Sequence, residues 1–430
     1  TEVRRIEDLP RAIHRAAKEA LSPPTGPVFL SLPVDVMNAA ADIDLGHATR
    51  VAPGIRGDAK AVADAAEMLL AARNPVIVAG DAVSQGLALD EVVRLAELLG
   101  AYVYLEGVAS TTNFPTTHPQ YFGQVLRLSP LIRETLKPHD VMLSLGGDLF
   151  TQSLPTKVEP LPDGIKVIHL DTDPREIGKN FPATIGILGE PKATVPDLIA
   201  EIERRLDGPA RTRLAARKKA TEATAAERRP RLFAAAAAQA KLSPIRPLAL
   251  LKTVADLLPK NAVVVEETLS SSERIREIIP SLDAKSFFGM RGGGIGWGLP
   301  AAIGVKLGQP NRPVVALIGD GSSMYTIQAL WTAAHHRIGC IVFMILNNAS
   351  YRILKQRMNA MRSYAAQTDT WPGMDLDDPP IDFVAIARAM GLKAGRAETL
   401  SQVGDRLKDA LAGNEPVLIE VKLDKGFKPV

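Results

Sequence analysis

The residues best suited to chemistry form two short motifs, each of which follows an apolar run. Gly319-Asp320-Gly321-Ser322 comes directly after residues 314–318, and Asn347-Asn348 comes directly after residues 341–346. Both runs are predicted to be buried parallel strands, and open α/β sheets bind ligands at the carboxyl ends of such strands. A carboxylate and an amide oxygen at that edge suit a hard cation such as Mg²⁺, which takes further ligands from phosphates and water. The sequence therefore predicts a metal site that also holds a phosphorylated ligand.

The spacing of the two motifs makes them more specific together than apart, because either one alone is more often a simple turn. Residues 322–346 separate them, and residues 324–338 have the apolar spacing of a helix that connects the two strands. The backbone N–H groups of Gly321 and Ser322, at the start of that helix, are expected to face phosphate groups. One βαβ unit would thus carry both halves of the site.

The rest of the chain divides into segments that position this edge. Residues 1–44 hold one amphipathic helix and a short predicted strand at 27–32, too little to form a core of its own. Residues 57–206 alternate amphipathic helices with apolar strands, which predicts a parallel sheet covered on both faces. Residues 207–247 are predicted to be a helical linker, and residues 248–430 a second α/β domain. The expected fold class is α/β, with parallel, doubly wound sheets.

Composition and charge exclude several classes of protein. The 430 residues are 46% hydrophobic and 23% charged, the formal net charge is +3, and Cys340 is the one cysteine. Ten Arg and Lys lie between Arg204 and Arg231. Glu222 and Glu227 interrupt this run without an accompanying aromatic cluster, which favours a solvated helix over a nucleic-acid site. No apolar run approaches the ~20 residues that span a bilayer. We expect a cytoplasmic protein that binds neither nucleic acid nor membrane.

The Gly-Asp-Gly motif, 25 residues and Asn-Asn together resemble the signature of thiamine-diphosphate-dependent enzymes. The resemblance extends along the chain. Residues 26–33 look like the end of that family's pyrimidine-binding domain, and residues 113–119 and 299–305 are similar to segments of benzoylformate decarboxylases. It implies the family's multidomain architecture, with the N-terminal pyrimidine-binding domain largely absent from this chain, and residues 248–430 as the diphosphate-binding domain.

The resemblance also implies the cofactors and their ligands. Thiamine diphosphate and Mg²⁺ are expected, with the metal bound by Asp320, the side chain of Asn348 and the backbone carbonyl of Ser350. The remaining positions expected to contact the cofactor are Ser270, Gly293, Gly294, Ile295, Gly321, Ser322 and Tyr351.

Two of these positions are implied to act in catalysis. The carbonyl of Gly293 would accept a hydrogen bond from the 4′-amino group of the cofactor, and Ile295 would bend the cofactor from below. The glycines of residues 292–298 allow a close approach of the backbone to the cofactor. The bent cofactor would decarboxylate a 2-oxo acid through ylide and enamine intermediates.

Three functions remain open on the sequence. The first is a decarboxylase of the benzoylformate type, the second an acetolactate synthase-like carboligase, and the third a non-catalytic oligomerising homologue. The family's activating glutamate belongs to the pyrimidine-binding domain and is expected upstream of these residues. Because the two domains of one site usually come from different subunits, a homodimer or homotetramer with shared active sites is expected.

The substrate pocket is expected to be formed by Leu269, Leu354 and Arg357. Leu269 stands where the family often has a polar residue, and Ser153 stands where benzoylformate decarboxylases have a histidine. Arg357 stands near the position of an aromatic residue that lines an aryl pocket. If its side chain points inward, the substrate carries a second anionic group; otherwise Arg357 belongs to a solvated helix face.

Overall fold

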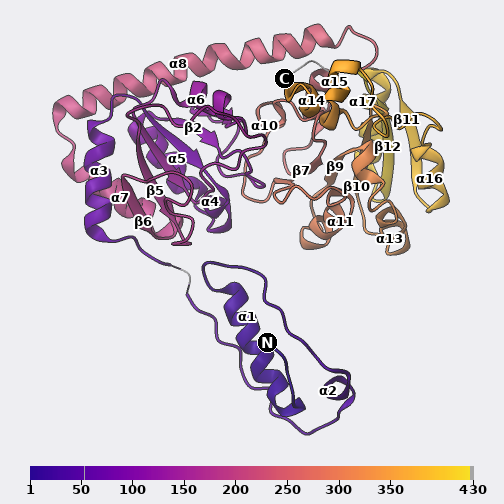
Figure 1. Ribbon diagram of the computed structural model, residues 1–430, viewed down its shortest axis with the longest axis horizontal. Coiled ribbons are helices and arrows are strands. Elements are labelled where there is room, and N and C mark those ends of the chain that lie inside the picture. Colours follow the sequence, from indigo (N-terminus) through magenta and orange to yellow (C-terminus); the bar gives the residue numbers. More distant parts are fainter. Residues whose placement is uncertain (53, 427–430) are drawn as a thin grey trace.

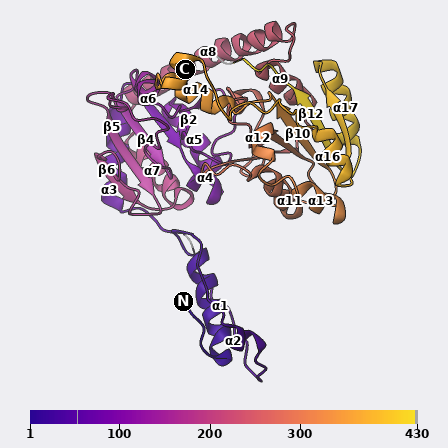
Figure 2. The same ribbon diagram turned by 45° about the vertical axis from the view of Figure 1, so that its right-hand side comes forward.

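A computed structural model describes residues 1–52 and 54–426, so the last four residues of the predicted 248–430 domain lie outside the described residues. Two α/β domains lie side by side beneath one long helix, and residues 1–52 lie apart from both (Figure 1, Figure 2). The helices are η1 (Ile6–Asp8), α1 (Leu9–Leu21), α2 (Val34–Asn38), α3 (Ala59–Ala71), α4 (Asp81–Gln85), α5 (Leu89–Leu99), α6 (Ser129–Leu136), α7 (Pro191–Arg205), α8 (Gly208–Gln239), α9 (Pro247–Leu257), α10 (Ile275–Ile278), α11 (Gly298–Gly308), α12 (Asp320–Ser323), α13 (Ala329–His335), α14 (Arg352–Ala360), α15 (Tyr364–Thr368), α16 (Phe383–Ala389) and α17 (Leu400–Ala412). The strands are β1 (Pro75–Ala79), β2 (Tyr102–Leu105), β3 (Tyr121–Gln124), β4 (Val141–Leu145), β5 (Lys166–Asp171), β6 (Ile185–Leu188), β7 (Val263–Glu267), β8 (Phe287–Gly289), β9 (Val314–Gly319), β10 (Ile341–Asn347), β11 (Lys393–Ala397) and β12 (Pro416–Lys422).

Each domain is built on one six-stranded parallel sheet, which confirms the predicted fold class. The strand order is β3-β2-β1-β4-β5-β6 in the first sheet and β11-β12-β10-β9-β7-β8 in the second. In both, the order reverses direction partway across, as in doubly wound folds. In the second sheet the central strands β9 and β10 are direct neighbours, with Leu346 paired to Gly319. Their carboxyl ends therefore meet at one edge.

The central strands are apolar throughout because both of their faces are buried. In β7, Val263 and Val265 pack with Leu299 of α11 and Leu330 of α13. Val264 packs on the other face with residues of α9 and α17. The first sheet is covered in the same way, with α3, α5 and α7 on one face and α6 on the other. These two-sided cores fix the sheet edges on which polar side chains gather.

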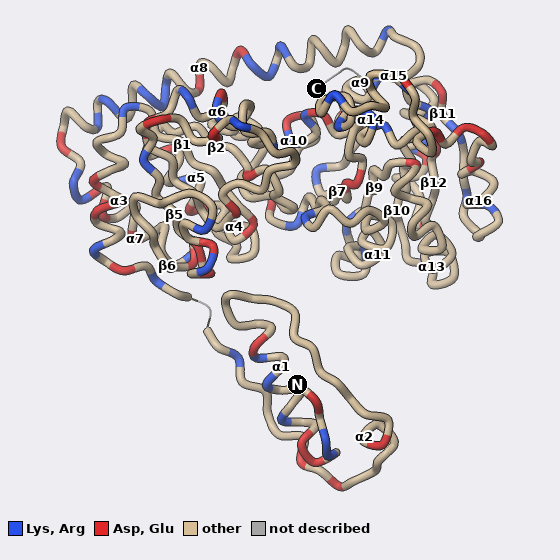
Figure 3. Tube along the Cα trace, viewed as in Figure 1, with Lys and Arg blue, Asp and Glu red and all other residues tan. Residues whose placement is uncertain are grey.

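The predicted helical linker contains α8, a single helix of 32 residues that runs over both domains (Figure 1). It is anchored to the first domain, where the Arg217 side chain donates to the carbonyls of Leu99, Ala72 and Arg73. Figure 3 shows its Lys and Arg residues spread along the helix with acidic residues among them. No helix in the described part of the chain is long and apolar enough to cross a membrane.

Two predicted elements are wrong. Residues 27–32 form no strand, and only an isolated bridge pairs Ser31 with Glu2, because no neighbouring strand supplies a ladder. The expected helix at 324–338 is also shorter. The four-residue α12 begins at Asp320 and is followed by a turn, and only residues 329–335 form α13.

Candidate functional site

The carboxyl edge of β9 and β10 brings together the three residues predicted to bind metal. Asp320 follows β9, and Asn348 and Ser350 follow β10; all three are buried. One oxygen of Asp320, Oδ1, accepts from the N–H of Gly321 at 2.8 Å. The other, Oδ2, is buried and has no hydrogen-bond partner among the described residues. A buried carboxylate oxygen without a partner is costly unless something else binds it, and a cation satisfies it.

Burial raises the pKa of Asp320 above its ordinary value. Nearby backbone N–H groups, led by that of Gly321, act in the opposite direction. No group of three or more His, Cys, Asp or Glu that could hold a metal occurs in the described residues. A site here would therefore use one carboxylate, one amide and one backbone carbonyl, a set of oxygen ligands that fits Mg²⁺.

The loop after β10 is held in place by its first asparagine. Asn347 Nδ2 donates to Oε1 of the fully buried Glu420 at 2.7 Å, and its Oδ1 accepts from the N–H of Ala349 at 2.9 Å. Ala349 adopts a left-handed φ of 54°, which turns the chain sharply. Asn348 Oδ1 then accepts from the N–H of Ser350 at 3.0 Å. Asn347 thus fixes the backbone, and Asn348 is the asparagine presented beside Asp320.

Gly321, Ser322 and Tyr351 lie next to this edge. A Cβ atom on Gly321 would overlap the ring of Tyr351, so only glycine lets the ring and the backbone pack together. Gly321 and Ser322 are buried, whereas Tyr351 is partly exposed. The N–H of Gly321 donates to Oδ1 of Asp320, which ties this glycine to the aspartate predicted to bind the metal.

The Ser270 side chain is tied to a buried arginine that the sequence analysis did not identify. Arg352 Nε donates to Ser270 Oγ at 3.1 Å, and Nη2 donates to Ser271 Oγ at 2.6 Å. Burial lowers the pKa of Arg352, while the charges of Asp424 and Asp320 act against that shift. Arg352 therefore places a buried positive charge directly against the loop at 269–271.

The glycine loop of residues 292–298 divides into an open half and a fixed half. Gly293 has a left-handed φ of 76°, and a Cβ there would meet no heavy atom within 4 Å. Gly293 and Gly294 are exposed, and Ile295 is half-buried. In the fixed half, buried Glu267 accepts from the N–H of Gly296 at 2.5 Å and from the N–H of Gly298.

Burial raises the pKa of Glu267, although the N–H groups that it accepts from favour its charged form. Its role could not be read from the sequence, where it is one of two adjacent glutamates at the end of a strand. In the structure it orients the loop that carries the two predicted catalytic positions, Gly293 and Ile295.

Arg291, which directly precedes the open half of the glycine loop, contacts the first domain. Its guanidinium pairs with Asp81 Oδ2 at 2.6 Å and with Asp148 Oδ1 at 3.3 Å. Burial alone would raise the pKa of Asp81, but hydrogen bonds led by those from Ser110 and Thr111 hold it at about 2. The loop is therefore held by a fixed negative charge from the neighbouring domain.

Glu106 lies in the same cluster and behaves differently from Asp81. It is 1% exposed, and neither carboxyl oxygen has a hydrogen-bond partner of regular geometry among the described residues. Burial raises the pKa of Glu106 to about 8; Arg291 opposes this, and the charges of Asp148 and Asp81 reinforce it. Glu106 is therefore mostly protonated at neutral pH.

The three predicted substrate residues are only partly buried. Leu269 is 37% exposed and has a left-handed φ of 50°, and Leu354 is 45% exposed on α14. The Arg357 side chain is half-buried, and its Nη1 donates to the carbonyl of Ser153 in the first domain at 3.1 Å. Arg357 therefore reaches across the domain junction rather than into bulk water.

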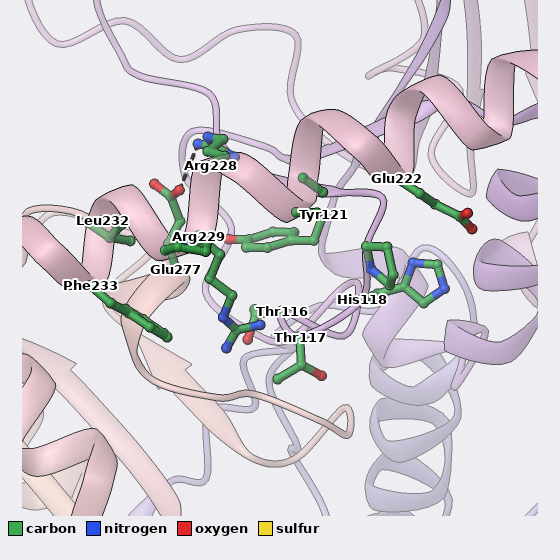
Figure 4. A pocket seen from close by; sticks show the side chains of 14 residues that line it. Thr116, Thr117, His118, Tyr121, Glu222, Arg228, Arg229, Leu232, Phe233 and Glu277 are labelled. Carbon is green, nitrogen blue, oxygen red and sulfur yellow. Dashed lines mark ion pairs between the residues drawn. The ribbon is translucent and has the colours of Figure 1, made fainter.

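A separate cavity of about 520 Å³ lies between α8, residues 116–121 and Glu277 (Figure 4). Its Arg228 is paired with Glu277 at 2.7 Å. The cavity is lined by none of the predicted site residues, so it is distinct from the edge described above.

Comparison with known proteins gives the family. Residues 277–421 match the C-terminal TPP binding domain of thiamine pyrophosphate enzymes, and residues 62–198 match the central domain of the same enzymes. The chain is 33% identical to a benzoylformate decarboxylase of Pseudomonas aeruginosa over 96% of its own length and 74% of that protein. This chain belongs to the thiamine pyrophosphate enzymes.

Two further relatives show the range of the family. A probable acetolactate synthase large subunit of Methanocaldococcus jannaschii is 28% identical over 98% of this chain and 71% of that protein. Among solved structures, the benzoylformate decarboxylase from Polynucleobacter necessarius is similar, with a TM-score of 0.84 and 26% identity over 100% of this chain and 76% of that one. The relatives of this chain therefore include proteins named as decarboxylases and a protein named as a synthase.

Proposed function

We propose that this chain forms part of a thiamine-diphosphate- and Mg²⁺-dependent decarboxylase of 2-oxo acids. The observation that carries the proposal is the buried Oδ2 atom of Asp320, which has no partner among the described residues and lies beside Asn348 at the carboxyl edge of β9 and β10. Asp320, Asn348 and the carbonyl of Ser350 would hold the metal. The similarity to benzoylformate decarboxylases supports decarboxylation as the reaction.

Thiamine diphosphate, when bound, supplies a nucleophilic carbon and a cationic ring that takes up electrons as CO₂ leaves. The residues of this chain bind and orient. Ser270, Gly321, Ser322 and Tyr351 would contact the diphosphate, with the Arg352 charge behind Ser270.

The glycine loop would orient the reactive part of the cofactor. Gly293 and Gly294 are open, so their backbone can approach a ligand closely. The Gly293 carbonyl would accept a hydrogen bond from an amino group, and the half-buried Ile295 side chain would press on the ring system from below. Glu267 and Arg291 hold the two ends of this loop by contacts that need no ligand.

The site is proposed to be completed by a pyrimidine-binding domain of another subunit in a homodimer or homotetramer. The exposed apolar side chains of residues 1–52, such as Phe29 at 78% and Val34 at 71%, fit a segment that packs against further protein.

A CO₂-release assay over aryl, branched and dicarboxylic 2-oxo acids, with thiamine diphosphate and Mg²⁺ present, tests the proposal. Decarboxylation predicts one aldehyde for each CO₂. The second candidate, an acetolactate synthase-like carboligase, is favoured by the similarity to that group and predicts a 2-hydroxy-2-alkyl-3-oxo acid in place of free aldehyde. Cofactor binding without any turnover would instead support a non-catalytic, oligomerising homologue.

A further inference from the structure

Two arginines from different domains meet on one short loop of the first domain. Arg127, which follows β3, donates from Nε to the carbonyl of Thr151 at 3.3 Å. Arg357, in α14 of the second domain, donates from Nη1 to the carbonyl of Ser153 at 3.1 Å. The backbone of Arg127 is also fixed, because its carbonyl accepts from the N–H of Ser153 at 2.8 Å and from Ser153 Oγ at 2.9 Å. Both guanidinium groups thus contact the same short segment, residues 151–153.

These two positive charges are not neutralised. Neither Arg127 nor Arg357 forms an ion pair with a carboxylate within residues 1–52 and 54–426, and both are half-buried. Burial and the nearby charge of Arg357 both lower the pKa of Arg127, as expected for two guanidinium groups close together. Each guanidinium has five N–H donors, and the described residues engage one on each. Paired arginines with free donors at a domain junction are suited to a carboxylate, which they bind in a fork-like, bidentate way.

The arginine pair is linked to the glycine loop by a short series of contacts. Thr151 Oγ1 donates to Asp148 Oδ2 at 3.2 Å, and Asp148 Oδ1 accepts from Arg291 Nη2 at 3.3 Å. Arg291 is followed at once by Gly292 and Gly293. On the other side, Arg357 lies six residues after Tyr351, on the helix that begins at the metal-binding loop. The arginine pair is therefore connected to both segments of the proposed site, through residues 148–153 on one side and through α14 on the other.

We propose that Arg127 and Arg357 bind the distal carboxylate of the substrate, so that this chain acts on 2-oxo acids that carry a second anionic group. The inference rests on the proposed function, because it names the substrate class of that site. Arg357 contacts the backbone carbonyl of Ser153, the residue that stands where the family resemblance implied a histidine. Binding of the distal carboxylate would direct the 2-oxo group toward the glycine loop. A neutral substrate would have no group to pair with the two arginines.

The direct test is equilibrium binding of unreactive probes to the full chain, which requires neither cofactor nor turnover. Terephthalate carries two carboxylates and benzoate one, on the same ring. We expect terephthalate to bind roughly ten- to a hundredfold more tightly than benzoate, the range for a charge-assisted pair. Arg127→Met and Arg357→Met should each remove most of this preference. Arg362→Met is the matched control, since Arg362 is exposed just beyond α14 and its side chain has no described partner.

Turnover then separates this inference from the proposed function. Phenylglyoxylate and its 4-carboxy derivative differ only in the distal carboxylate, and kcat/KM should favour the 4-carboxy compound in the parent but not in Arg357→Met. If neither compound is decarboxylated while terephthalate still binds through the two arginines, the proposed function fails and the anion site stands. Equal affinity of the parent for terephthalate and benzoate, or a preference that survives in both arginine variants, would overturn the inference.

Discussion

Replacing Glu106 by Gln should change how the stability of the first domain depends on pH. Glutamine has nearly the same shape as a protonated glutamic acid but carries no charge at any pH. Glu106 is buried beside Asp81, Asp148 and Arg291, and burial raises its pKa to about 8. The substitution therefore keeps the neutral state that predominates at pH 7 and removes the charged state that forms above it.

The sign of the effect follows from proton binding. In the unfolded chain Glu106 loses its proton near its ordinary pKa of 4.5, and in the folded protein near about 8. Between these pKa values the folded state binds one proton more than the unfolded state. The contribution of Glu106 to the free energy of unfolding therefore falls as pH rises through this window and is lost above about 8. Each pKa unit corresponds to about 1.4 kcal/mol, so the whole window corresponds to at most about 5 kcal/mol.

Thermal unfolding measured from pH 5 to pH 9 tests this expectation. For a domain of this size about 1 kcal/mol shifts Tm by roughly 2–4 °C, so the parent should lose on the order of 10 °C more than Glu106→Gln across the range. The comparison uses the slopes of Tm against pH, because the Tm values of the two proteins will differ somewhat at any single pH. Glu134→Gln, at an exposed position on α6, is the control and should follow the parent. Parallel Tm profiles for the parent and Glu106→Gln would refute the reasoning.

Three further predictions concern the glycine loop and the diphosphate side. Ile295→Ala should lower turnover more than thiamine diphosphate affinity, measured by kcat and calorimetry, and a large loss of affinity with normal kcat would count against the assigned role. Glu267→Gln leaves one acceptor oxygen for two N–H groups, so it should lower the free energy of unfolding by about 1–3 kcal/mol and speed amide hydrogen exchange at Gly296 and Gly298. Unchanged exchange at these two amides would contradict this prediction. Gly321→Ala should cost about 1–3 kcal/mol through overlap with Tyr351, and in a Tyr351→Ala background most of that loss in unfolding free energy should disappear.

The sheet edge was predictable from the sequence because its strands are continuous apolar runs that end abruptly at polar residues. Residues 314–318 and 341–346 became β9 and β10, so the motifs that follow them had to meet. The same reasoning failed for residues 27–32, where a short apolar run existed but no partner strand did. It also failed for residues 324–328, which form a turn where helical spacing predicted a helix.

The supporting contacts were not predictable, because their partners are far apart along the chain. Glu267 reaches Gly298, 31 residues away, and Arg352 reaches Ser270, 82 residues away. Arg291 and Asp81 are separated by 210 residues and belong to different domains. A single sequence shows the type of each of these residues but not which buried group it will face.

The central claim is that Asp320 binds the metal that holds the diphosphate, and calorimetry of thiamine diphosphate with and without Mg²⁺ tests it most directly. The account predicts Mg²⁺-dependent binding to the parent, no measurable binding to Asp320→Ala, and unchanged binding to Asp256→Ala, an exposed aspartate on α9. Circular dichroism should show that all three proteins are folded. Thiamine diphosphate affinity in Asp320→Ala equal to that of the parent would contradict the claim.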